Sequence, residues 1–304
     1  KGYEVLTEVE GSMIHKEDAV EAIRKAVTTR QAELDLTGAE YYEEPKIFSD
    51  DERLNKEAEE LNAYTNLTFS YDMHGVPVTV DGDQIHEWLG CAADGTVTVD
   101  EELAKAYVKE LARSYDTAYR KHAFTTAEGK DITIDSGFYG WRMNRAEETQ
   151  KLIELIKQGA VEKREPIYIQ TAASYGERDY GDTYVEINLS KQHLYFWEKG
   201  NIIIESDFVS GNMVKGMGTP GGIFPITYKE RNAVLKGTNY RTPVSYWMPF
   251  NGGIGMHDAS WRKEFGGTIY ETRGSHGCIN LPFEVAKEIY EHVEAGMPVI
   301  CYYE

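Results

Sequence analysis

The residues with the clearest chemical potential form the run GSHGCINL at positions 274–281. A cysteine thiol is mostly protonated at neutral pH, and a nearby imidazole allows it to react as a thiolate. Gly277 permits an unusual backbone turn beside Cys278, and the amides of such a turn can face a developing oxyanion. A helix expected to start at Pro282 would bring the positive end of its dipole behind the thiol. Together these features indicate acyl transfer through a thioester on Cys278.

The base that serves Cys278 must come from another segment, and His257 is the preferred candidate because it lies on a glycine-rich, strand-like stretch. His276 competes for this role, but on an extended backbone two positions from the cysteine it is poorly placed to hold the thiol. A neutral imidazole also needs an acceptor for its second nitrogen. The Asp258 side chain would point to the other face of the strand. We therefore expect the backbone carbonyl of Ser275 to orient His257.

The other two cysteines lack such surroundings. Cys301 lies in an apolar run that predicts a terminal strand and a buried, inert thiol, and Cys91 follows a helix-like stretch as a cap or loop residue. Three cysteines are too few for a disulfide framework. A zinc site formed by His257, His276 and Cys278 is an alternative to nucleophilic catalysis. It lacks a fourth ligand at suitable spacing, so we expect neither a metal nor another cofactor.

The composition narrows the classes of partner. The chain has 304 residues and a formal net charge of −19, which argues against nucleic acid and against an anionic membrane surface as ligands. An acidic surface is compatible with a polymer that carries amines and peptide stems. No stretch approaches the roughly 18 apolar residues of a membrane span. Because the sequence opens at Lys1 without a methionine, we expect membrane contact only through an anchor that precedes it.

The elements around these residues change character near residue 180. Residues 1–170 carry long amphipathic helix patterns, including one over 101–119 with Asp100 as its N-cap. From residue 182 the pattern alternates with period two, and a late helix over 282–294 ends before a glycine. The sequence predicts a multidomain α+β protein, in which N-terminal α+β modules precede a mostly-β, sandwich-like domain with a late helix.

A faint internal repeat lies within the N-terminal part. Residues 11–47 and 140–167 both contain a glycine after a strand-like lead-in, then a helix, then a proline that opens an extended exit. The pattern favours a repeated module. The alternative is that these are two unrelated strand-helix units.

The segment 124–141 resembles the peptidoglycan-binding modules that precede some bacterial L,D-transpeptidase domains. The resemblance covers residues 60–175, with a partial second copy before it. It implies domains at 1–60, 61–180 and 181–304, of which the first two are module-like. Tyr139 and Trp141 could stack on sugar rings, or they could be core residues.

The C-terminal part resembles the YkuD-type L,D-transpeptidases, in which a histidine precedes a Ser-His-Gly-Cys turn by fifteen to twenty residues. The resemblance covers residues 182–304. It implies a β-sandwich-like catalytic domain in which Cys278 is the nucleophile and His257 the general base. Ser275 would hold the base, and the amides of Gly277 and Cys278 would form part of the oxyanion hole. His276 and Arg273 would lie in the cleft wall.

Further residues are candidates for contact with substrate. Asn280 stands where many members of the family have arginine, so its contact with substrate is open. Thr219, Tyr240 and Trp247 are expected to line the cleft, and residues 231–249 suit a lid over a peptide groove. The alternative for these aromatic residues is a place in the core.

The resemblance implies a peptidoglycan L,D-transpeptidase that forms 3-3 cross-links. Its thiol would attack the third residue of a tetrapeptide stem and release the terminal D-alanine, and an amine of a neighbouring stem would accept the acyl group. Stem peptides are thus the expected partners, and a β-lactam such as a carbapenem is expected to acylate the cysteine. Two alternatives remain, an L,D-carboxypeptidase that trims stems and a catalytically silent wall-binding protein. The expected location is extracellular, at the wall or the outer face of the membrane.

Overall fold

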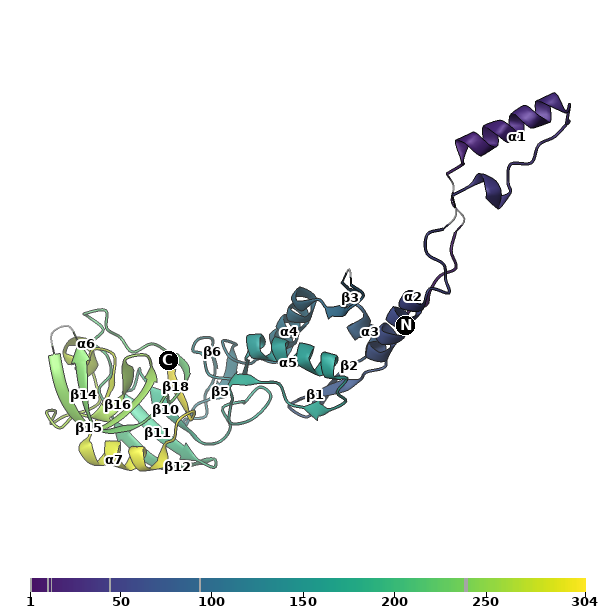
Figure 1. Ribbon diagram of the computed structural model, residues 1–304. Helices are drawn as coiled ribbons and strands as arrows, with labels where there is room; N and C mark the ends of the chain where they lie inside the picture. The colour runs from purple at the N-terminus through teal and green to yellow at the C-terminus, as the bar shows by residue number, and fades with distance from the viewer. Residues whose placement is uncertain (1, 10, 12, 44, 93, 238–239) are drawn as a thin grey trace. The chain divides into compact units, whose positions relative to one another are not determined.

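The structure is a computed structural model that describes every residue except 1, 10, 12, 44, 93, 238 and 239, and it leaves the side chains of residues 39 and 240 undescribed (Figure 1). The chain divides into two compact units. One contains residues 1–108 and 146–165, and the other contains residues 109–145 and 166–304. In the described part of the chain, none of the helices combines the length and apolar character needed to cross a bilayer.

The N-terminal unit packs helices on a small sheet with the strand order β2-β1-β8. Strand β1 pairs antiparallel with β2 and parallel with β8. Its residues Phe69, Tyr71 and Met73 are buried and alternate with partly exposed ones, as expected of a strand with one face on a core. The elements of this unit are α1 (Lys16–Thr28), the 3₁₀ helix η1 (Ala39–Tyr41), α2 (Glu52–Thr65), β1 (Phe69–Met73), β2 (Val76–Val80), α3 (Gly82–His86), β3 (Leu89–Cys91), β4 (Val97–Val99), α4 (Glu101–Tyr115), α5 (Arg145–Gln158) and β8 (Lys163–Arg164), with α4 and α5 extending past its limits.

Helix α4 begins where the sequence predicts. The Asp100 carboxylate accepts hydrogen bonds from the amides of Glu102 and Leu103, at 2.9 and 3.1 Å. These amides have no partner inside the helix, so the aspartate satisfies donors that would otherwise need water.

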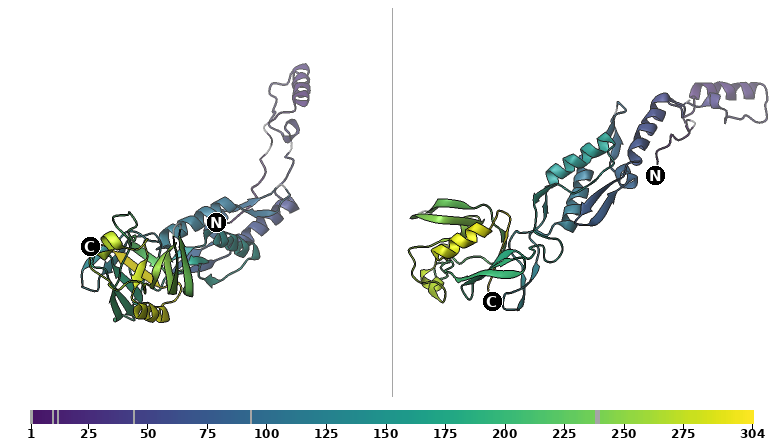
Figure 2. Two further views of the ribbon diagram at one scale, coloured as in Figure 1. Left: turned by 90° about the vertical axis from the view of Figure 1, so that its left-hand side faces the viewer. Right: turned by 90° about the horizontal axis from the view of Figure 1, so that it is seen from below.

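The two segments of the suggested repeat each contain a helix between two strand contacts, but the contacts fall at different positions. A helix is enclosed in each copy by an antiparallel strand contact, between Ile14 and Tyr42 around α1 and between Met143 and Tyr168 around α5. Figures 1 and 2 show the segment after α1 returning beside that helix. The strand partners do not match, however, because Tyr42 lies three residues before Pro45 and Tyr168 lies two residues after Pro166. The strand pairing therefore does not follow the equivalence suggested by the sequence.

The C-terminal unit contains two larger sheets, with strand orders β12-β11-β10-β18-β13 and β14-β15-β16-β17. Helix α7 packs against β15 and β16 (Figure 2). The expected mostly-β, sandwich-like domain with a late helix is confirmed. Its elements are β5 (His122–Thr125), β6 (Asp131–Ile134), β7 (Arg142–Met143), β9 (Tyr168–Gln170), β10 (Tyr184–Asn188), β11 (His193–Glu198), β12 (Asn201–Asp207), β13 (Gly222–Pro225), β14 (Glu230–Gly237), β15 (Tyr240–Asn251), β16 (Ile254–Asp258), α6 (Ile269–Arg273), β17 (Ile279–Leu281), α7 (Phe283–His292) and β18 (Pro298–Tyr302).

The compact units cut the chain differently from the expected domains 1–60, 61–180 and 181–304, which stay a prediction. Residues 109–145 group with the C-terminal unit because their hairpin bonds to its sheet. The amide of Ala127 donates to the buried carboxylate of Glu186 at 2.8 Å, and Gly137 forms a parallel bridge with Ile223.

Tyr139 and Trp141 belong to this connecting segment and are core residues. Tyr139 is 1% exposed, and its hydroxyl accepts a hydrogen bond from the Ala173 amide. The Trp141 indole donates to the Ser174 carbonyl, and its ring stacks on Tyr175 at 4.8 Å. Tyr139 and Trp141 are both buried, so neither ring is exposed for stacking on a sugar, and the alternative of core residues applies.

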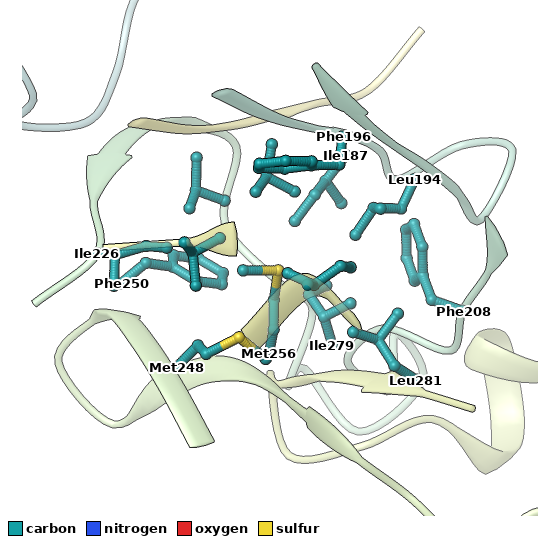
Figure 3. Close-up of a cluster of buried hydrophobic side chains, with 14 of the residues drawn as sticks. Ile187, Leu194, Phe196, Phe208, Ile226, Met248, Phe250, Met256, Ile279 and Leu281 are labelled. Atoms are coloured by element: carbon teal, nitrogen blue, oxygen red, sulfur yellow. The ribbon is translucent and has the colours of Figure 1, made fainter. Parts of the chain in front are cut away.

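The main core of this unit lies between its two sheets. Ile187, Leu194 and Phe196 come from the five-stranded sheet and face Met256 and Ile279 of the four-stranded sheet (Figure 3). Side chains of a strand alternate between its faces. Because Met256 and Ile279 point into the core, their neighbours on β16 and β17 point to the outer face of the four-stranded sheet. That outer face carries the candidate site.

Candidate active site

The central residues of the site are positioned by two neighbouring parallel strands. Strand β16 pairs with β17 so that His257 lies opposite Asn280. Cys278 directly precedes β17, and two positions separate it from Asn280, so alternation places both side chains on the same face as His257. The sheet therefore brings together a thiol, an imidazole and an amide that are some twenty residues apart in sequence.

These side chains open into a pocket of about 250 Å³. One wall comes from the hairpin of β14 and β15, and the other from the segment between β16 and β17. The lining residues are Leu235, Thr242, His257, Trp261, Arg262, Gly274, Ser275, His276, Cys278 and Asn280.

Cys278 is held in a protonated state by its surroundings. The side chain is 9% exposed, and its sulfur lies 3.6 Å from the Gly253 carbonyl, to which the thiol donates. Burial raises the pKa of Cys278, and a hydrogen bond from the Gly255 backbone offsets only part of this effect. The net direction is upward, because the desolvation of a buried thiolate outweighs this hydrogen bond.

His257 is a neutral imidazole in a fixed orientation. It is 3% exposed, and its Nδ1 lies 2.8 Å from the Asp258 carbonyl oxygen. Since a carbonyl only accepts, Nδ1 carries the hydrogen and Nε2 keeps its lone pair. That lone pair faces the Asn280 amide nitrogen at 3.0 Å. Burial lowers the pKa of His257, and the hydrogen bond to Asp258 opposes this only in part.

The orienting group is thus the carbonyl of Asp258 and not that of Ser275, which corrects the expectation from the sequence. The imidazole folds back onto the backbone of its own strand neighbour, whose carbonyl is within reach of Nδ1. The Asp258 side chain does point away, as expected, and accepts hydrogen bonds from the amides of Ser245 and Tyr246 at 2.7 and 2.8 Å. Ser275 instead gives its carbonyl to the Asn212 amide.

Ser275 shapes the turn that carries the cysteine. Its hydroxyl donates to the Cys278 carbonyl at 2.6 Å and accepts from the Gly277 amide at 3.0 Å. Gly277 has φ of +125°, which favours glycine because a side chain is strained there. The Gly277 amide was expected in the oxyanion hole, but here it is bound to the Ser275 hydroxyl.

Two residues expected to contact substrate are buried supports. Thr219 is 1% exposed, and its hydroxyl donates to the Gly277 carbonyl at 2.6 Å. Trp247 is 5% exposed and packs in a small apolar cluster with Cys278. Both fall outside the pocket lining, so the alternative of a core position applies to Trp247, and Thr219 fixes the turn.

Of the other residues expected in the cleft, two line the pocket and one does not. His276 is exposed and Asn280 is 2% exposed, and both line the pocket. Arg273 is exposed and outside the lining, and the side chain of Tyr240 lies outside the described residues.

The segment 231–249, expected to form a lid, belongs to an antiparallel hairpin of β14 and β15. Leu235 and Thr242 are paired across this hairpin and line the pocket. Paired backbone residues hold this wall, so the described part of the segment is a hairpin of the sheet and not a loop.

Sequence reasoning missed Trp261 and Arg262. The Trp261 ring lies 5.9 Å from that of His257. Arg262 donates from Nε to the Asn280 Oδ1 at 2.8 Å. Both follow His257 by four and five positions, and this proximity was the available signal. Among the described residues, no group of three His, Cys, Asp or Glu side chains is placed to hold a metal ion.

Two protein families match the chain. The L,D-transpeptidase catalytic domain, YkuD, matches residues 182–301. A family described as "Putative peptidoglycan binding domain" matches residues 47–163. The two matches follow one another along the chain.

Two solved structures are similar over most of the chain. The Ldtfm–avibactam carbamoyl enzyme is 36% identical, with 82% of this chain and 98% of that chain covered and a TM-score of 0.62. A cysteine-to-serine mutant of the Enterococcus faecium L,D-transpeptidase is 35% identical, with 81% and 100% covered and a TM-score of 0.62.

A curated relative from Bacillus subtilis, named "Putative L,D-transpeptidase YciB", is 27% identical over 125 residues. The match covers 38% of this chain and 64% of that relative. The chain therefore spans less than two thirds of the length of the curated relative it matches.

Proposed function

The chain belongs to the L,D-transpeptidase family, and on that premise we propose that it is a cysteine-dependent peptidoglycan L,D-transpeptidase that forms 3-3 cross-links. The observation that carries the proposal is the pocket shared by His257, on β16, and Cys278, the residue directly before the neighbouring parallel strand β17. An orienting carbonyl, that of Asp258, keeps the hydrogen of His257 on Nδ1, so that Nε2 is unprotonated and can act as an acceptor.

In the first step, the Cys278 sulfur attacks the carbonyl carbon of the third residue of a tetrapeptide stem. His257 accepts the thiol proton at Nε2. For this step, Nε2 gives up its hydrogen bond with the Asn280 amide and forms one with the thiol. The bond between the third and fourth residues breaks, and the protonated imidazole gives its proton to the departing amine of D-alanine. A thioester remains on Cys278.

In the second step, the side-chain amine of a neighbouring stem attacks the thioester. His257 removes a proton from that amine, the carbon–sulfur bond breaks, and the Cys278 thiol regains its proton. The new amide bond joins the third residues of two stems. If water replaces the amine, the product is a free tripeptide.

We propose an extracellular location for this chain, at the wall or the outer face of the membrane, because the proposed substrate is a wall component. We propose that residues 47–163 bind peptidoglycan, supported by the family they match. β-Lactams are proposed as covalent inhibitors that acylate Cys278. The support is chemical, because a strained cyclic amide offers the thiol a carbonyl like that of the stem.

The test is incubation of the protein with a purified disaccharide-tetrapeptide, followed by mass spectrometry. We expect a cross-linked dimer and free D-alanine. Replacement of Cys278 by alanine should abolish both products, while Cys91→Ala, at an exposed position, should retain them. Tripeptide without dimer would establish the carboxypeptidase, and a Cys278→Ala variant with full activity would refute the mechanism. A protein that binds stems without any product would be the wall-binding alternative.

A further inference from the structure

Arg262 is a cation in the active-site pocket that the reaction above does not use. It is half-buried and lines the same pocket as Cys278 and His257. Its Nε donates to the Asn280 Oδ1 at 2.8 Å, and one terminal nitrogen donates to the Arg273 carbonyl at 2.9 Å. A guanidinium has five N–H donors in a planar fork, so these two contacts leave donors available.

The partners of Arg262 do not neutralise its charge. Both acceptors are neutral, and among the described residues no carboxylate forms an ion pair with it. Burial lowers the pKa of Arg262, and the charge of Arg273 lowers it further. A desolvated cation without a counter-charge is unfavourable.

The chain has 51 acidic residues, yet no aspartate or glutamate is found among the described residues that line this pocket. The pocket therefore lacks an anion that the protein could readily have supplied. A ligand that brings its own carboxylate would complete it.

The position of Arg262 matches the position of such a group in the donor stem. Cys278 and Asn280 are two residues apart on one face of an extended segment, a separation of about 7 Å. Arg262 reaches the Asn280 end of that span. In a tetrapeptide, the terminal carboxylate lies one residue beyond the carbonyl under attack, at most about 3.6 Å further along the backbone. A donor attacked by Cys278 can thus extend its terminus toward the guanidinium.

We propose that Arg262 binds the carboxylate of the terminal D-alanine and selects donor stems that end at the fourth residue. The inference rests on the proposed transpeptidase function. An ion-paired fork would favour a stem with a free carboxylate next to the scissile bond over one in which that group is masked.

The experiment compares two donors with the full chain, a tetrapeptide stem that ends in D-alanine and the same stem that ends in D-alanine amide. The measurement is kcat/KM for release of the fourth residue. We expect the wild type to prefer the free carboxylate by about ten- to one-hundredfold, the range of a charge-assisted hydrogen bond. In Arg262→Gln the ratio of the two kcat/KM values should fall to nearly one, mainly because kcat/KM falls for the donor with the free carboxylate. Arg262→Lys should retain part of it, and Lys263→Gln, an exposed neighbour outside the pocket, should retain all of it.

Three outcomes would overturn the inference. If the wild type has no preference, the enzyme does not recognise the terminal carboxylate. This result does not depend on whether a variant folds. If Arg262→Gln loses equal activity on both donors, Arg262 acts through Asn280 and His257 instead. If the wild type processes neither donor, the proposed function itself fails and takes this inference with it, whereas wild-type turnover without preference leaves the function standing.

Discussion

Each compact unit contains a buried polar network built around an arginine, and the two networks are completed differently. In the N-terminal unit, both terminal nitrogens of Arg164 contact the fully buried carboxylate of Glu148, which also accepts from the Tyr71 hydroxyl at 2.7 Å. Burial lowers the pKa of Arg164, but Glu148, with smaller contributions from Tyr71 and Glu162, more than compensates, and the net shift is upward. In the C-terminal unit, Arg262 meets only neutral acceptors and its pKa is lowered.

The difference teaches how a structural network can be told from one that serves a ligand. The network of Arg164 balances its charge within the protein, so its loss should affect folding. The network of Arg262 ends in a pocket with a thiol and an imidazole lone pair, so its loss should affect chemistry. The following predictions test this separation, from the largest expected effect to the smallest.

The largest effect is expected from replacement of His257 by glutamine. Removal of the general base should lower the rate of cross-linking by about 10²–10⁴-fold, the usual contribution of a positioned proton acceptor. The free energy of unfolding should change by less than about 1.5 kcal/mol, because an amide can keep a hydrogen bond to a backbone carbonyl. Product analysis and urea unfolding measure the two quantities. A variant that cross-links normally would remove His257 from the mechanism.

Glu148→Gln is the counterpart in the N-terminal unit. It removes the buried partner of Arg164 and leaves only the more exposed carboxylate of Glu162, 3.6 Å from Nε. The expected cost is about 3 kcal/mol in the free energy of unfolding. Acylation of Cys278 by a β-lactam in the folded fraction should be unchanged, because the substituted residue belongs to the other unit. Glu154→Gln, an exposed position on the same helix, is the matched control. Equal stability of the two variants would contradict the distinction between the networks.

The smallest effect concerns pH. The raised pKa of Cys278 and the lowered pKa of His257 both favour the neutral pair. Alkylation of Cys278 by iodoacetamide should therefore keep rising with pH beyond the ordinary thiol pKa of about 8.5. Below that pH it should lack the reactive plateau that a thiolate–imidazolium pair would give. Mass spectrometry of Cys278, with exposed Cys91 as internal reference, follows both thiols in one sample. A plateau of Cys278 reactivity at pH 5–7 would show that the resting pair is ionic.

The sequence was informative where chemistry depends on residue type and local pattern. Cys278 could be singled out because it lies in a turn that contains glycines. His257 could be singled out because it lies on a strand-like segment rich in glycine. The alternation from residue 184 predicted β10 and β11, whose inward residues Ile187 and Leu194 are in the core.

The sequence was insufficient where the answer depends on contacts between distant segments. The choice of Asp258 over Ser275 as orienter depends on the rotation of one imidazole, which no pattern records. Trp247 and Thr219 have residue types common in clefts, and only the packing of the two sheets shows that they lie beneath the site. Arg262 became a candidate only when the pairing of β16 with β17 brought Asn280 within its reach.

The parallel pairing of β16 and β17 also bears on how such an enzyme can diversify. Strands that run in the same direction need a long connection, and here it spans residues 259–278 and carries Trp261, Arg262 and His276. Exchanges at Trp261 and Arg262 in this connection alter one wall of the pocket, while the pairing of β16 with β17 holds His257 and the residue that follows Cys278 in register. Substrate preference and the catalytic activity of Cys278 and His257 can therefore change independently of one another.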